Sequence, residues 1–113
     1  MFKNQLNSVK EICDYATELD SDMDYDYLYD FLSEDGSNKT AVLKSVPVSM
    51  VSPSSSENKN HLINNSKQKA YNKKDSKYQP PILVDSDFVI IDGHHRYRAS
   101  LHREDAEILV YVI

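Results

Sequence analysis

Apolar residues near the start of the chain recur at steps of three and four, and this spacing predicts an amphipathic helix over residues 2–19. The apolar stripe of this helix is formed by Phe2, Leu6, Val9, Ile12, Cys13, Ala16 and Leu19. Because Cys13 lies on the stripe, we expect its thiol in the core and not in the role of a nucleophile.

A second helix is expected directly after the first. The polar run Asp20-Ser21-Asp22 ends the first helix and is expected to cap the second. The packed face of this second helix is predicted to hold Met23, Tyr27, Phe31, Leu28 and Leu32. The run Asp35-Gly36-Ser37-Asn38 then predicts a stop and a turn.

The rest of the chain shows strand patterns. β-Branched residues over 40–51 predict a strand, and Pro47, which has no N–H, places it at a sheet edge or starts it there. The apolar runs 82–84 and 88–91 flank a short acidic turn and predict a hairpin. A helix is expected over 94–101 and a closing strand over 107–113. Together these elements predict an α+β fold, a small mixed sheet with flanking helices.

Charge divides the chain into three regions. Residues 1–36 hold ten acids against two lysines, a net of −8; residues 37–79 carry +6 and residues 80–113 carry −3. The total of −5 argues against a general coat for nucleic acid. The segment 52–77, rich in Ser, Asn and Lys, is expected to be a mobile loop with a short helix, or partly disordered. A single cysteine, no long apolar run and no signal-peptide pattern predict a cytoplasmic protein without a membrane span.

The candidate chemistry lies where the second strand of the predicted hairpin meets the next helix. There the sequence reads Asp92-Gly93-His94-His95-Arg96-Tyr97-Arg98. The first turn of a helix offers unpaired amides and the positive end of the helix dipole, which together attract anions. Gly93 allows a tight turn, and His94, His95, Arg96 and Arg98 add donors. The pattern therefore predicts a seat for phosphate groups, while turn, surface and ion-pair roles for the same residues stay open.

Other catalytic and metal motifs are missing from the sequence. With glycine only at positions 36 and 93, neither a P-loop nor a dinucleotide fingerprint is possible. On a helix, the adjacent His94 and His95 point about 100° apart, so we expect no metal held by protein ligands alone. A magnesium ion held mainly by nucleotide phosphates fits the sequence better.

Residues 46–113 resemble the ParB/sulfiredoxin superfamily. The resemblance is carried by the strand Ile82-Leu83-Val84 after a Pro-Pro pair, by the glycine-led helix start, by Arg98-Ala99 and by the closing strand. It implies a nucleotide-binding domain over 46–113, preceded by an acidic helical extension over 1–45. His94 stands where sulfiredoxin has its cysteine, so reduction of sulfinic acids is not expected. The triplet after Gly93 also lacks the Glu of the chromosome-partition CTPases.

The free-serine kinase branch of the superfamily, which carries Asp-Gly-His-His-Arg, is the most similar. This likeness implies that Asp92 is the catalytic base and that Gly93, His94, His95 and Arg96 hold the phosphates of ATP, ADP or CTP, with Mg²⁺. A small hydroxyl compound would accept the phosphoryl group. That branch also uses a Glu after its first strand, where this chain has Ser52-Pro53-Ser54.

Two other functions remain open from the sequence. The basic region 37–79 is compatible with a non-enzymatic nucleotide- or DNA-linked regulatory module. The mixture of aspartates and tyrosines over 20–35 is compatible with an acidic interaction or inhibitor protein that binds a protein partner. The small size suggests a phage or another mobile element as the source.

Overall fold

The computed structural model describes residues 2–19, 23–54 and 79–113. Within these residues, five strands form one mixed sheet in the order β1-β2-β5-β3-β4. The strands are β1 (Gln5–Leu6), β2 (Ala41–Pro47), β3 (Ile82–Val84), β4 (Ile90–Asp92) and β5 (Glu107–Val112). The described helices are α1 (Val9–Leu19), α2 (Tyr25–Leu32), the short 3-10 helix η1 (Val48–Met50) and α4 (His94–His102). The predicted α+β class is confirmed.

The sheet is antiparallel except at one pair. β5 lies beside β2 in antiparallel register and beside β3 in parallel register, with Leu83 opposite Tyr111. β3 and β4 form the predicted antiparallel hairpin, and α4 and β5 follow as expected from the sequence. β3 is buried along its whole length, which is typical of a strand covered on both faces.

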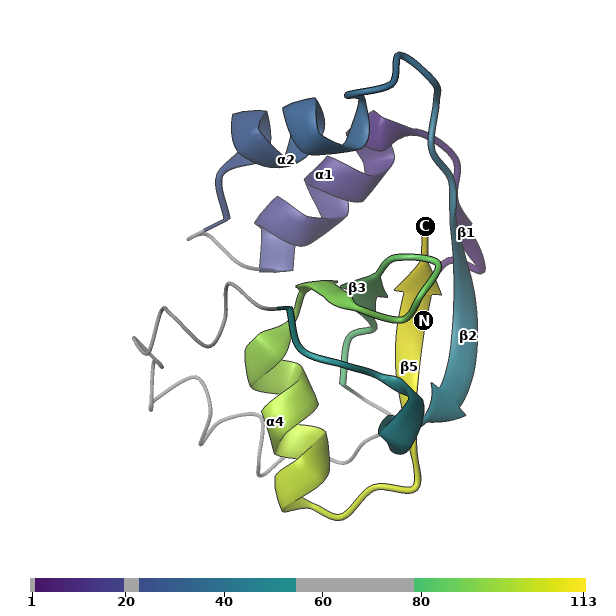
Figure 1. The fold of residues 1–113 in the computed structure, drawn as a ribbon, viewed down its shortest axis with the longest axis vertical. Helices are drawn as coiled ribbons and strands as arrows, with labels where there is room; N and C mark the ends of the chain where they lie inside the picture. Colours follow the sequence, from purple (N-terminus) through teal and green to yellow (C-terminus); the bar gives the residue numbers. More distant parts are fainter. Residues whose placement is uncertain (1, 20–22, 55–78) are drawn as a thin grey trace.

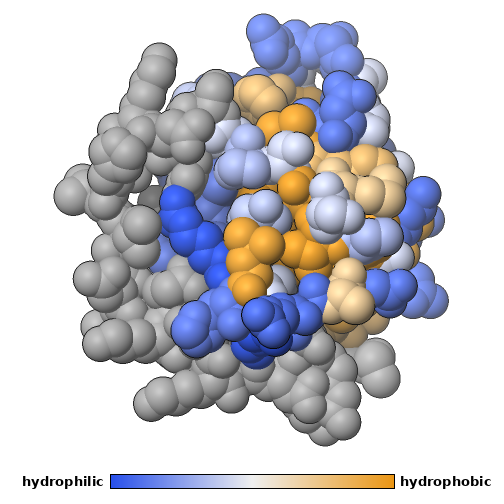
Figure 2. Space-filling model, turned by 60° about the horizontal axis from the view of Figure 1, so that its bottom comes forward, coloured by the Kyte–Doolittle hydropathy of each residue, from blue (hydrophilic) through white to orange (hydrophobic). Residues whose placement is uncertain are grey.

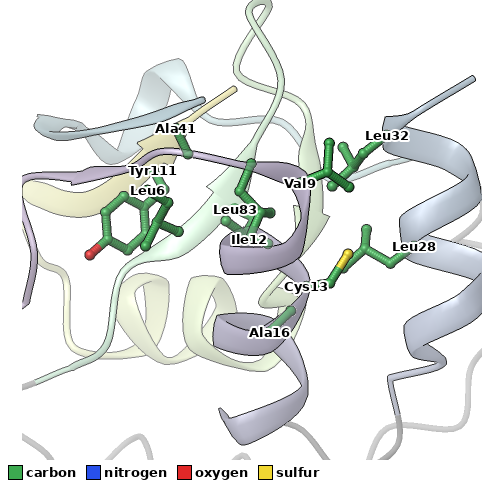
Figure 3. Packing of buried hydrophobic residues seen from close by; sticks show 10 residues of the cluster. All are labelled: Leu6, Val9, Ile12, Cys13, Ala16, Leu28, Leu32, Ala41, Leu83 and Tyr111. Carbon is green, nitrogen blue, oxygen red and sulfur yellow. The ribbon is translucent and has the colours of Figure 1, made fainter. Parts of the chain in front are cut away.

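Helices cover both faces of the sheet. One cluster of buried residues joins α1 and α2 to Leu83 and Tyr111, and Figure 3 shows α1 between these sheet residues and Leu28 and Leu32 of α2. The other cluster, which includes Ile82, lies on the side of the sheet where α4 and η1 pack. Figure 1 shows α1 and α2 together at one end and α4 along the sheet below them.

The N-terminal helix is shorter than the periodicity predicts. α1 begins at Val9, while Gln5 and Leu6 pair with β2. A local capping pattern fixes this start: the Ser8 hydroxyl accepts from the Glu11 amide at 3.1 Å, and the Glu11 carboxylate accepts from the Asn7 amide at 3.0 Å. The prediction of a helix from residue 2 was therefore wrong over its first turns. Cys13 is fully buried in the core, as expected.

The second helix buries part of the predicted face and exposes the rest. Leu28 and Leu32 are buried, whereas Tyr27 is 69% exposed and Phe31 is 51% exposed. Its cap is Asp24, whose carboxylate accepts from the Tyr27 amide at 3.2 Å, in place of the predicted run at 20–22, which lies outside the described residues. The residues of each pair, Tyr27 with Phe31 and Leu28 with Leu32, are four positions apart. Periodicity alone therefore does not tell which pair is buried.

The first long strand ends at the proline. β2 stops at Pro47 and continues into η1, so the alternative in which the strand starts there was wrong. The edge-strand alternative was wrong as well, because β2 lies between β1 and β5, although β1 pairs only with Ala41 and Val42. The predicted division between residues 45 and 46 lies within β2. The region before it supplies β1 and the layer that covers one face of the sheet. The division into two domains stays a prediction, and residues 55–77 of the Ser-, Asn- and Lys-rich segment lie outside the described residues.

A buried polar network fixes the far end of α4. Gln79, only 2% exposed, donates from its amide nitrogen to the Ser100 hydroxyl at 3.2 Å and accepts from the Arg103 guanidinium at 2.6 Å. Arg103 also pairs with Asp105 at 2.9 Å.

Figure 2, which brings the lower end of the view in Figure 1 forward, shows apolar surface bordered by hydrophilic side chains. Within the described residues, no helix is long and apolar enough to cross a bilayer.

Candidate functional site

Helix α4 starts at a glycine that directly follows β4. Gly93 is the N-cap, and its φ of 115° lies in the left-handed region that favours glycine. Its carbonyl accepts the first helical hydrogen bond, from the Tyr97 amide at 2.9 Å. A Cβ here would lie 2.5 Å from Cγ2 of Ile82, so a larger residue does not fit against β3. Because glycine has no side chain, the cap residue supplies no acceptor to the first amides of α4.

Asp92 and Arg96 form a buried ion pair beneath this helix start. Their side chains are 5% and 3% exposed, and Nη2 of Arg96 lies 3.3 Å from Oδ2 of Asp92. Nη1 of Arg96 donates to the Pro81 carbonyl at 2.7 Å and approaches the Pro80 carbonyl at 3.4 Å. The guanidinium thus joins the end of β4, the first turn of α4 and the segment that leads into β3.

These contacts differ from the expectation that Arg96 presents its guanidinium to a polyanion. On α4, Arg96 shares the buried face with Ala99 and Ser100. A charged side chain is tolerated there because its guanidinium donates to a backbone carbonyl and to a carboxylate. The contacts favour a positioning role for both Arg96 and Asp92. The ligand role of Arg96 and the base role of Asp92 stay predictions.

The N-terminal region also reaches this site. The hydroxyl of Tyr15, on α1, donates to the same Pro81 carbonyl that accepts from Arg96. Burial raises the pKa of Tyr15, so the phenol remains protonated and acts as a donor. The ring of Tyr15 contacts that of Tyr111 edge to face, with centroids 4.9 Å apart. Helix α1 therefore contacts the site through the Pro81 carbonyl, the acceptor that it shares with Arg96.

Three of the predicted donors lie on the more exposed side of α4. His94, His95 and Arg98 are each partly exposed, and Arg98 follows His94 by four residues, so the two share a helix face. Burial, together with the neighbouring His95, lowers the pKa of His94 to about 4. The His94 ring is therefore neutral at physiological pH.

The sequence did not identify Ser54 as a member of this site. Its hydroxyl lies 3.2 Å from Nε2 of His94, and its amide donates to the same nitrogen at 3.3 Å. The only sequence signal was positional: the segment 52–54 occupies the place where the kinase branch has its Glu. In the part of the chain that the structure describes, no group of three His, Cys, Asp or Glu side chains lies close enough to hold a metal ion.

The fold is similar to solved ParB N-domain structures. A Pnob8-like ParB-N domain matches with a TM-score of 0.53 and 19% sequence identity, over 64% of this chain and 29% of that chain. A pNOB8-like ParB N-domain structure matches with a TM-score of 0.48 and 22% identity, over 65% of this chain and 28% of that chain. No protein-family model and no curated protein sequence matches the chain.

The comparison with the first structure shows a ParB N-domain-like fold. The chain spans less than a third of the length of each of these two matched structures. The predicted ParB-like fold is thus confirmed. The finer likeness to the serine kinase branch stays a prediction from the residues 92–96.

Proposed function

We propose that the start of α4 binds the phosphate groups of a nucleoside di- or triphosphate with Mg²⁺. The observation that carries the proposal is the glycine cap, which leaves the first amides of α4 without a side-chain acceptor from the cap residue. Arg98 and the two histidines add donors on the exposed side, while the buried pair of Arg96 and Asp92 keeps the helix start in position.

The proposed reaction is transfer of a phosphoryl group to a hydroxyl. Such transfer depends on positioning and on neutralising charge, which a helix N-terminus and an arginine supply. The Mg²⁺ ion would be carried mainly by the nucleotide phosphates, in keeping with the few protein ligands it usually takes. A non-enzymatic nucleotide- or DNA-linked module shares the same binding step and differs in having no turnover.

Calorimetric titration with ATP, ADP, CTP and pyrophosphate, each with Mg²⁺, tests the proposal. We expect one of these compounds to bind, and Arg98→Ala to weaken its binding at least tenfold while the melting temperature changes little. Leu101→Ala, which alters an exposed side chain on the same helix, is the matched control. Absence of binding by every compound contradicts the proposal. Binding to DNA that weakens steeply with salt would favour the DNA-linked module.

A second candidate function, binding of a basic protein partner, is favoured by the exposed aromatic residues of α2. Tyr27 and Phe31 line a groove of about 240 Å³ between α2 and β4, and Asp85 lies on its far wall. Exposed aromatic side chains beside acids are typical of surfaces that bind proteins. Asp26 and Asp30 lie four residues apart on the same helix and would attract lysine and arginine.

A basic peptide with a central leucine tests this second candidate by fluorescence anisotropy. We expect binding that weakens with salt and is lost when Tyr27 and Phe31 are both changed to Ser. Changing the exposed Leu101 to Ser controls for a general loss of apolar surface. Equal binding by all three proteins would exclude the groove. Point substitutions are used here, since deletion of the whole acidic region 1–45 would also remove β1 and most of β2 from the sheet.

A further inference from the structure

A serine hydroxyl is already in place at the proposed phosphate site. Ser54 lies 40 residues before His94 in the chain, yet its Oγ is 3.2 Å from Nε2 of the imidazole. Its position follows from a nearby bridge to β4. The Ser52 amide donates to the Phe88 carbonyl at 3.0 Å, and the Ser52 carbonyl accepts from the Ile90 amide at 2.9 Å. The chain is thus anchored to the sheet two residues before Ser54.

His94 is placed within hydrogen-bond distance of this hydroxyl, with Nε2 3.2 Å from Oγ of Ser54. Its Nε2 accepts a hydrogen bond from the Ser54 amide at 3.3 Å, so this nitrogen carries the lone pair and the ring proton is on Nδ1. The low pKa of His94 agrees with a ring that stays neutral at physiological pH. A hydroxyl within hydrogen-bond reach of a neutral imidazole is the usual arrangement of an activated serine.

The carboxylate that the sequence predicts as the base is placed differently. Asp92 is 5% exposed and pairs with the Arg96 guanidinium at 3.3 Å. The side chain of His94, in contrast, lies within hydrogen-bond distance of the Ser54 hydroxyl. Because His94 is also the first residue of α4, that hydroxyl lies at the helix start where the phosphates would bind.

We propose that Ser54 is itself a phosphoryl acceptor, so that the chain phosphorylates its own Ser54 from a bound nucleoside triphosphate. This inference rests on the proposed function. Ser54 Oγ forms a bond to the γ-phosphorus, and the bond from that phosphorus to the β,γ-bridging oxygen breaks, which releases the nucleoside diphosphate. The hydroxyl proton passes to Nε2 of His94 and then to water. The phosphoserine dianion formed would be stabilised by the positive end of α4.

The test is incubation of the full chain with Mg²⁺ and ATP labelled at the γ-phosphate, followed by peptide mapping. We expect label on the peptide that contains Ser54 and none in Ser54→Ala. Ser54→Thr keeps a hydroxyl and is expected to retain labelling, as is the control Ser52→Ala. His94→Gln keeps a polar group near Nε2 but no base, and we expect labelling to slow at least a hundredfold.

Nucleotide binding, measured in parallel, separates the two proposals. Wild-type protein that binds ATP but stays unlabelled overturns the self-phosphorylation of Ser54 and leaves the nucleotide site standing. Label that persists in Ser54→Ala overturns it as well, because the acceptor is then another residue. Wild-type protein that binds none of the nucleotides overturns both proposals together.

Discussion

The two helices α2 and α4 begin in opposite ways. At α2, the Asp24 side chain accepts from the Tyr27 amide at 3.2 Å, so the chain caps its own helix with an acid. At α4 the cap is Gly93, which has no side chain to offer, and the residues that follow are basic or titratable. Both helix starts carry the partial positive charge of the backbone amides. At α2 the cap side chain neutralises this charge, whereas at α4 the cap residue has no side chain to do so.

This difference shows how a common element becomes a binding site. Self-capping stabilises α2 and removes its attraction for anions, since an acid already occupies the position. At α4, other contacts hold the helix start in place. Gly93 fits against Ile82, and the buried ion pair of Arg96 and Asp92 fixes the first turn. We therefore expect changes beneath α4 to affect stability and changes on its exposed side to affect binding.

Removal of the buried guanidinium is expected to have the largest effect. Arg96→Ala leaves Asp92 buried without its ion-pair partner, and breaking such a pair costs about 3–5 kcal/mol. Urea denaturation measures the loss. Arg98→Ala, two residues away on the exposed side, is expected to change stability by less than about 1 kcal/mol. Similar losses in the two variants would contradict the assignment of Arg96 as the positioning residue.

Glycine substitutions test the fit at the helix start. Gly93→Ala is expected to lower the free energy of unfolding by about 2–4 kcal/mol, because the new Cβ meets Ile82 and φ is 115°. Gly36→Ala is the matched control: its φ is also positive, 76°, but nothing lies within 4 Å of the new Cβ. We expect about 1 kcal/mol there. A Gly93→Ala loss no greater than that of Gly36→Ala would show that the close approach to β3 is unimportant.

Loss of the cap at α2 gives the converse case. Asp24→Ala removes the acceptor of the Tyr27 amide and is expected to cost about 1 kcal/mol in thermal or urea unfolding. Nucleotide affinity should be unchanged, because the Asp24 carboxylate accepts from the Tyr27 amide of its own helix and is not among the contacts described at the start of α4. A drop in affinity would mean that the two helix starts are coupled.

The smallest expected effect comes from His94 as pH falls. Its pKa in the folded protein is about 4, below the ordinary value of 6.5, so the unfolded chain binds more protons between these values. Stability from this group is complete above pH 6.5 and declines as pH falls towards 4. We expect about 1 kcal/mol for a partly exposed group. Denaturation at pH 7 and pH 4.5 should show a smaller difference in His94→Gln than in wild type.

The sequence predicts the second half of the fold well because its signals are local. The apolar run 82–84, the turn at 85–87 and the glycine at 93 mark the hairpin and the start of α4 without reference to distant residues. The prediction of a helix over the first residues fails for the same reason. Leu6 continues the helical spacing, but its pairing with β2 places it in a strand. A partner 35 residues away leaves no trace in a local pattern.

The site shows the same limit. The cluster of donors after Gly93 is visible in the sequence, but a run of polar residues does not reveal which of them is buried. Arg96 is placed under the helix by carbonyls from 80 and 81, and Ser54 reaches His94 across 40 residues. Neither contact can be predicted from composition or spacing, because both depend on how the segment before β3 and the segment after η1 meet α4.

We propose that the start of α4, and not that of α2, binds phosphate groups. The most direct measurement is the backbone amide NMR spectrum of ¹⁵N-labelled protein during titration with ATP and Mg²⁺. We expect the amide signals of His94, His95 and Arg96 to shift most and to saturate together, while those of Tyr25, Asp26 and Tyr27 stay in place. Unchanged amides at 94–96, or equal shifts at both helix starts, would contradict it.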